Sequence, residues 1–217
     1  MKLQDKLDAF KAEFTKKTPA EVVAVMNEAT EAMKATATAD RGPRTGAKWP
    51  EFALPNQDGQ VVRASELLTN GSLVVSFFRG HWCPYCNTEL KALAEAAPDF
   101  AEAGAYMVAI SPQTVEHVRE THKKLDLPFD VLSDAHGDFS QTLGLRFTLP
   151  EDLQAIYKSF GIDLPAFNGD DSWTLPMAAR FVVGPDGMII HADVNHDYTI
   201  RPEPQDTLAH VRALTPA

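Results

Sequence analysis

Apolar runs alternate with segments of helical periodicity through the middle of the chain. Residues 72–78 are almost all apolar, with β-branched and aromatic side chains, which predicts a strand buried on both faces. Leucines and alanines recur at helical spacing after residue 84, and a second buried strand is predicted at 105–111. A helix from 114 to about 125 and a short strand at 130–133 follow. Strands and helices in this alternation predict parallel pairing through right-handed crossovers.

Two predicted hairpins flank these elements. A turn signal at Asp58-Gly59 lies within 52–62, and Gly184-Pro185-Asp186-Gly187 joins two strands within 180–193. The remaining predictions are a helical turn at 65–68, helices at 138–143, 150–160 and about 203–214, and a polar loop at 161–174. We therefore expect an α/β chain that resembles the thioredoxin fold, with a mixed central sheet flanked by helices. A reactive turn at the carboxyl end of a central strand is where open α/β sheets place their sites.

The first part of the chain has the pattern of a helical extension. The apolar residues that recur there at helical spacing are Leu3, Leu7, Phe10 and Phe14. A second helix is predicted to start after them, with Thr18 as its cap, Pro19 at its first position and Glu21 closing a capping box. We divide the chain into a helical extension at 1–36, a Gly/Pro-rich linker at 37–48 and a thioredoxin-like domain at 49–217.

Charge and composition exclude some classes of partner. The 217 residues include 20 basic and 30 acidic side chains, for a formal charge of −10. Nucleic acid and anionic membranes attract clustered Lys and Arg, so neither is expected as a partner. No apolar stretch approaches a membrane span, and the first residues form an amphipathic segment instead of a signal-peptide core. We expect a soluble protein of the reducing cytoplasm, where a pair of cysteines serves catalysis more often than structure.

Both cysteines of the chain, Cys83 and Cys86, stand where the strand pattern changes to a helical one. Free backbone N–H groups and the positive end of the helix dipole stabilise a thiolate there, and the thiolate is the reactive form of cysteine. Two non-redox roles fit the pattern less well. Buried cysteines can be small apolar residues, but Pro84 between them and Trp82 before them favour a redox turn. A zinc site needs about four ligands, and His81 offers a third at best.

The segment Trp82-Cys83-Pro84-Tyr85-Cys86 resembles the active-site turns of thioredoxins and glutaredoxins. The wider pattern resembles the peroxiredoxins of the alkyl hydroperoxide reductase/thiol-specific antioxidant (AhpC/TSA) family, over residues of about 45–214. In that family a strand leads through Pro-x-x-x-Thr-x-x-Cys, often continued as Thr-Glu-Leu. Cys86 falls on the peroxidatic cysteine, and Thr88-Glu89-Leu90 matches the continuation. The strand at 106–111 and the hairpin around Phe181-Val-Val-Gly-Pro-Asp-Gly187 extend the resemblance.

Three positions depart from the family's pattern. Arg79 stands where the turn proline is expected, and Cys83 stands where the threonine is expected. The arginine that precedes the late hairpin falls on Ala178, and Arg180 lies two residues further on, which is the same face of a strand. Arg180 is therefore the candidate for the missing positive charge.

The resemblance implies a peroxidase cycle. A thiolate attacks the O–O bond and becomes a sulfenic acid, which a second thiol converts to a disulfide. By family position Cys86 attacks and Cys83 resolves, whereas by analogy with thioredoxin Cys83 attacks and Cys86 resolves. Both schemes end in a Cys83–Cys86 disulfide that thioredoxin, glutaredoxin or glutathione must reduce. No cofactor is implied, because sulfur performs the redox step.

Four nearby side chains are candidates for supporting roles. Arg79 either lowers the pKa of a thiolate or binds a peroxide oxygen, unless it is a strand-end cation that faces water. His81 is either a proton acceptor or a solvated loop residue, and Trp82 is expected to cover the site. Arg180 is the fourth, as the candidate for the missing positive charge. Glu89 is interpreted as a charge on the helix face. The stretch that ends Asp197-Tyr198-Thr199-Ile200-Arg201 resembles a stretch of the same family and either lines the site or packs as a loop, and loop packing is favoured.

Three functions are therefore compared. The first is a thiol peroxidase that acts on hydrogen peroxide or organic hydroperoxides through Cys83 and Cys86. The second is a general thiol–disulfide oxidoreductase that uses the same cysteines. The third is a redox sensor without enzymatic activity, whose disulfide state alters docking of the N-terminal helices. A homodimer is the expected assembly.

Overall fold

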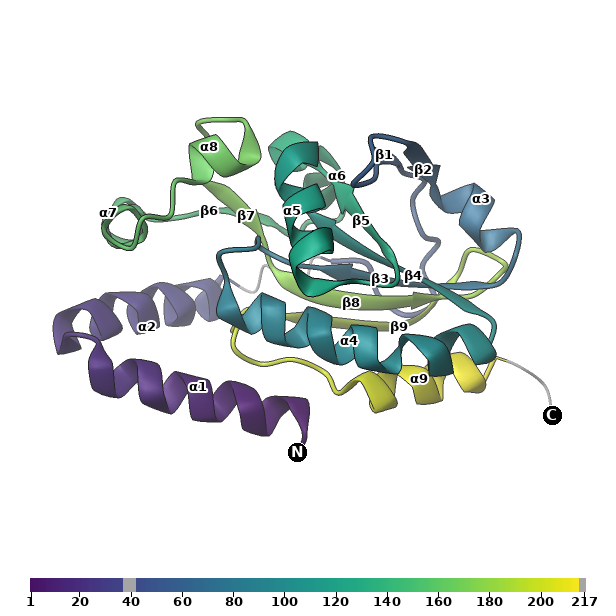
Figure 1. Ribbon diagram of the computed structural model, residues 1–217, viewed down its shortest axis with the longest axis horizontal. Coiled ribbons are helices and arrows are strands. Elements are labelled where there is room, and N and C mark those ends of the chain that lie inside the picture. The colour runs from purple at the N-terminus through teal and green to yellow at the C-terminus, as the bar shows by residue number, and fades with distance from the viewer. Residues whose placement is uncertain (37–41, 215–217) are drawn as a thin grey trace.

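The computed structural model describes residues 1–36 and 42–214, and a five-stranded mixed sheet forms its centre (Figure 1). Its strand order is β5-β4-β3-β8-β9. β3 pairs in parallel with β4, and β4 with β5, whereas β8 is antiparallel to both β3 and β9. The strands are β3 (Ser72–Phe77), β4 (Ala105–Ser111), β5 (Asp130–Ser133), β8 (Ala178–Val183) and β9 (Ile189–Asn195). The predicted thioredoxin-like fold with a mixed sheet is confirmed.

β3 lies in the middle of the sheet, and each of its residues is buried. Successive side chains of a strand point to opposite faces, so its apolar run supplies two cores. Leu73 and Val75 belong to the core that contains Phe139, and Val74 belongs to the core that contains Leu90. Apolar cores therefore enclose β3 on both faces of the sheet.

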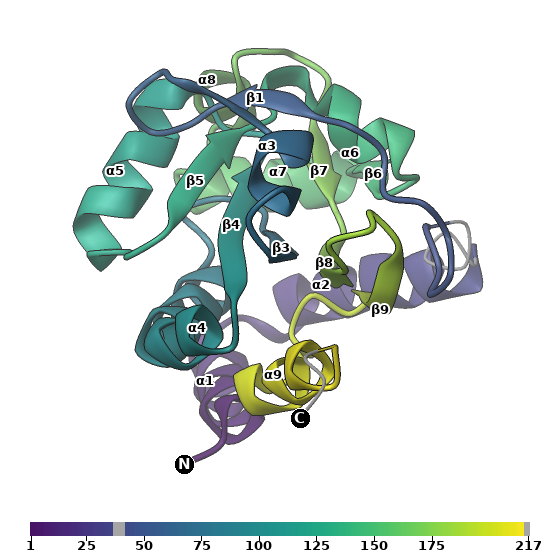
Figure 2. The same cartoon turned by 90° about the vertical axis from the view of Figure 1, so that its right-hand side faces the viewer.

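Helices α4 (Pro84–Glu102) and α9 (Pro204–Arg212) lie side by side along one side of the sheet (Figures 1 and 2). The other predicted elements are also present. They are α3 (Ala64–Leu68), α5 (Val115–Leu125), α6 (Asp138–Thr142), α7 (Glu151–Ser159), and the hairpin of β1 (Ala53–Pro55) and β2 (Val61–Arg63). A 3-10 turn, η2 (Ala135–Gly137), precedes α6.

The prediction of a polar loop at 161–174 is wrong in part. The segment contains α8 (Leu164–Asn168), and its end starts β7 (Thr174–Pro176), which pairs with β6 (Arg146–Thr148). Both elements are short, and the turn-forming run Asn168-Gly-Asp-Asp-Ser172 between them favoured a loop for the whole segment.

The N-terminal extension folds as two helices, α1 (Leu3–Lys17) and α2 (Ala20–Ala35), which form a hairpin at one end of the molecule (Figure 1). Leu3 and Leu7 of α1 are buried in the same core as α4. The carboxylate of Glu203 accepts hydrogen bonds from the backbone N–H groups of Leu3 (2.9 Å) and Gln4 (3.0 Å). This carboxylate thereby caps the start of α1, where backbone donors have no partner within the helix.

Thr18 does not cap α2 as predicted. Its N–H donates to Phe14 O and ends α1, and Pro19 takes the cap position of α2, where its carbonyl accepts from the N–H groups of Val22 and Val23. The linker predicted at 37–48 lies partly outside the described residues. None of the described helices is long and apolar enough to cross a bilayer.

Candidate active site

Both cysteines lie at the junction of β3 and α4. Cys83 is the residue just before the helix, Pro84 opens it, and Cys86 stands in its first turn. Gly80 makes the sharp turn possible: its φ is +154°, and a Cβ there would lie 2.5 Å from Trp82 Nε1. Both thiols are free and completely buried.

Arg79 connects the turn to two tyrosines. Its Nη2 donates to Cys83 Sγ at 3.1 Å, and its Nη1 donates to Tyr157 Oη at 2.9 Å. The guanidinium carbon lies 3.6 Å from the centre of the Tyr198 ring, within the range of a cation–π contact. Arg79 is 5% exposed, so it is not a strand-end cation that faces water. The structure places a buried positive charge against the sulfur of Cys83.

A second buried group of charges lies beneath Cys86. Glu89 Oε1 accepts a 2.5 Å bond from Arg180 Nη2, and Glu89 Oε2 accepts a bond from Arg201 Nη1. Arg201 Nη2 in turn lies 3.6 Å from Cys86 Sγ. All three charged side chains are 4% exposed or less. The interpretation of Glu89 as an outer helix-face charge is therefore wrong, because this carboxylate neutralises two guanidinium groups in the interior.

The surroundings shift the pKa values of the two thiols in opposite directions. Burial alone raises the pKa of Cys83, but a hydrogen bond from Cys86 and the charges of Arg79 and Arg201 outweigh it and hold that pKa well below its usual value. Burial, followed by the hydrogen bond and charge of Cys83, raises the pKa of Cys86 well above its usual value. Cys83 is therefore the more acidic thiol of the pair and the candidate nucleophile.

His81 and Trp82 flank the turn, and among the described residues neither makes a hydrogen bond to a sulfur. Gln113 holds His81 through a 2.9 Å bond from the backbone N–H of His81 and a 2.7 Å contact at Nδ1. Burial lowers the pKa of His81, so its ring is neutral near pH 7. Trp82 packs edge-on against Tyr157 at 5.4 Å and is half-buried. We expect both residues to shape the turn.

Arg180 does not occupy the position expected for it. Its guanidinium is used by Glu89, by Thr207 Oγ1 at 3.0 Å and by Pro202 O at 3.1 Å. The arginine contacts to sulfur come from Arg79 and Arg201 instead. Arg180 therefore holds Glu89, which holds Arg201 beside Cys86.

Sequence reasoning missed Arg201, Tyr157 and Tyr198 as members of the site. Arg201 and Tyr198 belong to the stretch that resembles part of a known family, for which loop packing was favoured over lining the site. That resemblance was the signal that could have found them. Tyr157 had no signal, because it stands on the apolar side of α7 like an ordinary core residue.

One group near the turn has the side chains of a cation site. Ligand atoms of His81, His117 and Glu120 lie within 4.8 Å of one another. Glu120 Oε2 is bonded to His117 Nδ1 at 3.1 Å, and the His81 Nδ1 is used by Gln113. The Nδ1 atoms of both histidines thus have protein partners, and neither cysteine belongs to the group.

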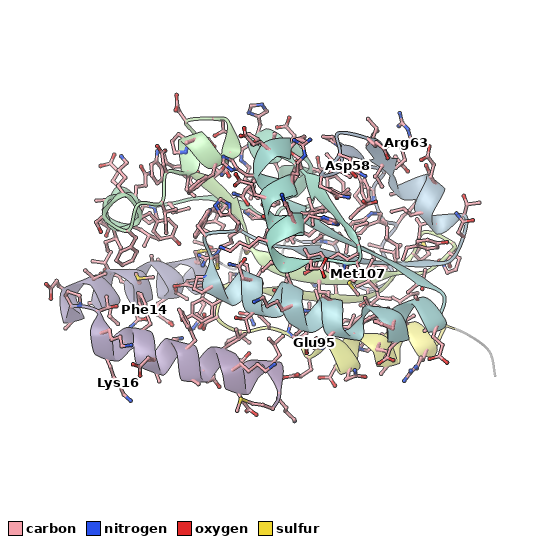
Figure 3. All side chains as sticks on the ribbon, in the orientation of Figure 1. Phe14, Lys16, Asp58, Arg63, Glu95 and Met107 are labelled. Carbon is pink, nitrogen blue, oxygen red and sulfur yellow. The ribbon has the colours of Figure 1, made fainter. Side chains whose placement is uncertain are left out.

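The extension covers the redox turn. The ring of Phe10 on α1 packs edge-on against Tyr85, with centres 5.1 Å apart, and Tyr85 packs in the same way against Tyr198 at 5.4 Å. Figure 3 shows Phe14 on the side of α1 that faces α2, whereas Lys16 points away. The aromatic side of α1 is therefore part of the wall around the cysteines.

Comparison with known proteins gives one family. The model of the AhpC/TSA family matches residues 45–192. A protein named "Putative peroxiredoxin" from Mycobacterium tuberculosis (strain CDC 1551 / Oshkosh) is 31% identical over 121 residues, which cover 55% of this chain and 79% of that protein. The chloroplastic peroxiredoxin Q of Oryza sativa subsp. japonica is 34% identical over 89 residues, or 41% of each chain.

A solved structure has the same fold. The crystal structure of peroxidoxin BcpB from Mycobacterium tuberculosis matches with a TM-score of 0.63 and 24% identity, and the match covers 80% of this chain and 99% of that one. The family match starts at residue 45, so both N-terminal helices lie outside it.

Proposed function

The chain belongs to the AhpC/TSA family, and we propose that it is a thiol-dependent peroxidase that reduces hydrogen peroxide or organic hydroperoxides through Cys83 and Cys86. One observation carries this proposal. Cys83 Sγ lies 3.1 Å from a buried guanidinium, and Cys86 stands three residues further on in the first turn of the same helix, so a nucleophile and a second thiol are close together. A peroxidase that ends in a disulfide needs that pair.

In the proposed first step the Cys83 thiolate attacks the outer oxygen of ROOH. An S–O bond forms and the O–O bond breaks, so sulfur is oxidised to the sulfenic acid while the peroxide is reduced to an alkoxide, or to hydroxide from hydrogen peroxide. The leaving oxygen takes up a proton and departs as an alcohol or water. Tyr157 accepts a bond from Arg79 and keeps its own proton, since burial raises its pKa, so its hydroxyl is positioned to supply that proton.

In the second step the Cys86 thiol attacks the sulfenic sulfur. The S–S bond forms, the S–O bond breaks, and the hydroxyl leaves as water with the thiol proton. An external thiol then returns two electrons through a mixed disulfide and restores both cysteines. Thioredoxin, glutaredoxin and glutathione remain the candidates for this reductant.

Burial of the sulfurs favours a small oxidant over a protein disulfide. Both cysteines are completely buried beneath Tyr85 and the aromatic side of α1, so a small oxidant needs a much smaller opening to reach the sulfurs than a folded protein does. This favours the peroxidase over a general thiol–disulfide oxidoreductase. The cytoplasmic location, the homodimer and the Cys83–Cys86 disulfide remain predictions.

The test uses the full chain with excess dithiothreitol and follows hydrogen peroxide consumption. We expect wild type to consume peroxide and both Cys83→Ser and Cys86→Ser to lose turnover, whereas Thr88→Ser on the same helix keeps it. Dimedone labelling mapped by mass spectrometry then assigns the roles. In Cys86→Ser the sulfenic acid persists, so the label is expected on Cys83.

Two results would change this conclusion. Consumption by wild type no faster than by dithiothreitol alone removes the peroxidase assignment. A dimedone label on Cys86 in the Cys83→Ser variant, with none on Cys83 in Cys86→Ser, reverses the two roles and restores the order implied by family position.

A further inference from the structure

Two apolar cavities meet at Arg79. The larger, which we call the α2 cavity, has a volume of about 240 Å³. The smaller, the turn cavity, has a volume of about 90 Å³ and is bounded by Trp82, Pro84 and Tyr85 next to the cysteines. Four residues line both cavities: Met26, Arg79, Tyr157 and Tyr198. These shared residues form the partition between the two spaces.

The α2 cavity is walled by apolar side chains on two sides. Ala29, Ala32 and Met33 of α2 form one side, and Phe147, Leu149 and Leu153 form the other. Its polar side chains are Arg79, Tyr157 and Tyr198 of the partition, together with Thr30, Thr36 and Thr148. An apolar chamber with a few polar groups is typical of a small-molecule site that orients its ligand.

Arg79 has a donor that the protein leaves unused. Among residues 1–36 and 42–214, its buried Nε–H finds no acceptor, although both Nη atoms are bonded. A buried donor without a partner costs free energy unless a ligand or water accepts its hydrogen. Trp82 Nε1 is unpaired as well, but it lies against Gly80, so it is not counted as a ligand donor. Arg79 therefore offers a hydrogen bond at the boundary between an apolar chamber and a thiolate.

The volumes fit a ligand with two unequal parts. A dry cavity of about 150 Å³ in a protein accommodates benzene, so the α2 cavity has room for an aryl or branched alkyl group of that size or larger. The turn cavity has room for only a few atoms, since one water occupies about 30 Å³ in the liquid. A hydroperoxide with an apolar substituent has this shape: a small O–O–H group attached to a bulky apolar body.

We propose that the α2 cavity binds the apolar group of an aryl or alkyl hydroperoxide and that α2 thereby determines substrate preference. This inference rests on the proposed peroxidase function. The O–O–H group lies at Arg79, where the free Nε–H donates to an oxygen and the Cys83 thiolate stands 3.1 Å from Nη2. The body of the substrate lies between α2 and the segment 147–153. Since α2 lies outside the family match, this specificity element belongs to the chain's own N-terminal extension.

The first experiment measures binding without chemistry. It uses the full chain with both cysteines changed to serine and titrates 2-phenyl-2-propanol, the alcohol product of cumene hydroperoxide, by calorimetry. We expect saturable 1:1 binding. Ala29→Phe fills the cavity and is expected to weaken binding by roughly tenfold, a typical effect of changing an apolar pocket by a group of this size. Ala24→Phe is the matched control, because Ala24 is exposed on the same helix and lines neither cavity.

The second experiment measures specificity with both cysteines intact. The ratio of kcat/KM for cumene hydroperoxide to that for hydrogen peroxide is expected to fall about tenfold in Ala29→Phe and to stay at the wild-type value in Ala24→Phe. If Ala29→Phe fails to fold, Ala32→Phe replaces it, because Ala32 is exposed at the mouth of the cavity and its side chain is not part of a core.

The outcomes separate this inference from the proposed function. The inference is overturned if the ratio of kcat/KM values is the same in Ala29→Phe and Ala24→Phe, or if the alcohol shows no saturable binding. Either result leaves the peroxidase assignment intact. A different outcome would overturn the peroxidase assignment: wild type consumes neither peroxide, yet the alcohol binds and Ala29→Phe abolishes that binding. The cavity would then remain an apolar ligand site, but the substrate class proposed for it would fall with the peroxidase assignment.

Discussion

Arg79 donates a 3.1 Å hydrogen bond to Cys83 Sγ, and these two residues occupy the positions where the family's pattern has a proline and a threonine. The two departures therefore belong together. A buried guanidinium without an anion and a buried thiolate without a cation would each be strongly destabilising, whereas the pair compensates both charges. Cys83 supplies a second sulfur where the family's pattern has the neutral hydroxyl of threonine. Arg79 supplies a positive charge from within the turn itself.

Replacing Arg79 should change the pH dependence of the reaction. In wild type the pKa of Cys83 is lowered, so the rate with peroxide should rise less steeply between about pH 6 and 8 than that of a free cysteine, whose pKa is about 8.5. Arg79→Gln removes the cation, raises the pKa of Cys83 and should lower the rate at pH 6 by about tenfold or more, with recovery at higher pH. The ultraviolet absorbance of the thiolate, measured against pH, gives the shift directly.

Two variants serve as controls for this profile. Arg79→Lys keeps the positive charge and should retain part of the low pKa. Arg212→Gln removes an exposed arginine at the end of α9 and should leave the profile unchanged. An Arg79→Gln profile equal to that of wild type would show that Arg79 does not stabilise the thiolate.

Glu89→Gln should destabilise the fold. The carboxylate is 2% exposed and neutralises Arg180 and Arg201, so its loss leaves two buried guanidinium groups without an anion. Breaking a buried pair in this way costs about 3–5 kcal/mol. Chemical denaturation at neutral pH measures the free energy of unfolding. Glu95→Gln is the control, because Glu95 is exposed on the same helix (Figure 3), and a loss equal in both variants would contradict the role assigned to Glu89.

Asp197 should contribute stability that acid removes. Burial raises its pKa, but hydrogen bonds from Thr199 and the charges of Lys11 and Lys34 outweigh burial and lower that pKa. A lowered folded-state pKa means that the contribution is fully present above the unfolded value of about 3.9 and disappears as the pH falls through the folded value. Asp197→Asn should therefore be less stable than wild type at pH 7, by about 1 kcal/mol because both lysines are more than 40% exposed.

Denaturation curves at neutral pH and at about pH 3 test this expectation, since the difference between Asp197→Asn and wild type should shrink in acid. Asp171→Asn, in an exposed loop, provides the comparison. A difference that stays constant with pH would mean that Asp197 stabilises the fold through packing alone.

Loosening α1 should make the cysteines easier to reach. Glu203→Gln weakens the cap on Leu3 and Gln4, which is worth about 1 kcal/mol for a typical helix start. Since 1 kcal/mol corresponds to about a fivefold change in an equilibrium, alkylation of the cysteines by iodoacetamide should become up to about fivefold faster. Glu13→Gln changes an exposed acid of α1 that is paired with Lys17, and it should leave the alkylation rate unchanged. Equal rates in both variants would mean that docking of α1 does not limit access.

The residue pattern within the segment was sufficient to predict the redox turn. An apolar run, Gly80, Cys83 and Pro84 in that order specify a strand, a turn and a helix start, because each effect acts within a few residues of the chain. The same holds for both hairpins and for the apolar residues of α1. The helix α8 was missed because the turn-forming run that follows it favoured a loop, and β6 was missed because no hairpin turn marks its three residues.

Charge assignment required the folded chain. From sequence, Arg79 was equally consistent with solvent and with the site, Arg180 was the candidate for the missing cation, and Glu89 was interpreted as a surface charge. The structure buries all three and brings Arg201 to Cys86 across 115 positions of the chain. A charge acts through distance in space and through the loss of water around it, and neither quantity is written in the spacing of residues.

The sequence by itself therefore determined the order of strands and helices, the place of the two sulfurs and the family resemblance. Tertiary structure decided which cation meets which sulfur, which thiol is the more acidic, and that α2 lines an apolar cavity that reaches Arg79. The physical reason is range: backbone conformation follows from neighbours in the chain, whereas ionisation and cavity shape follow from groups that only folding brings together.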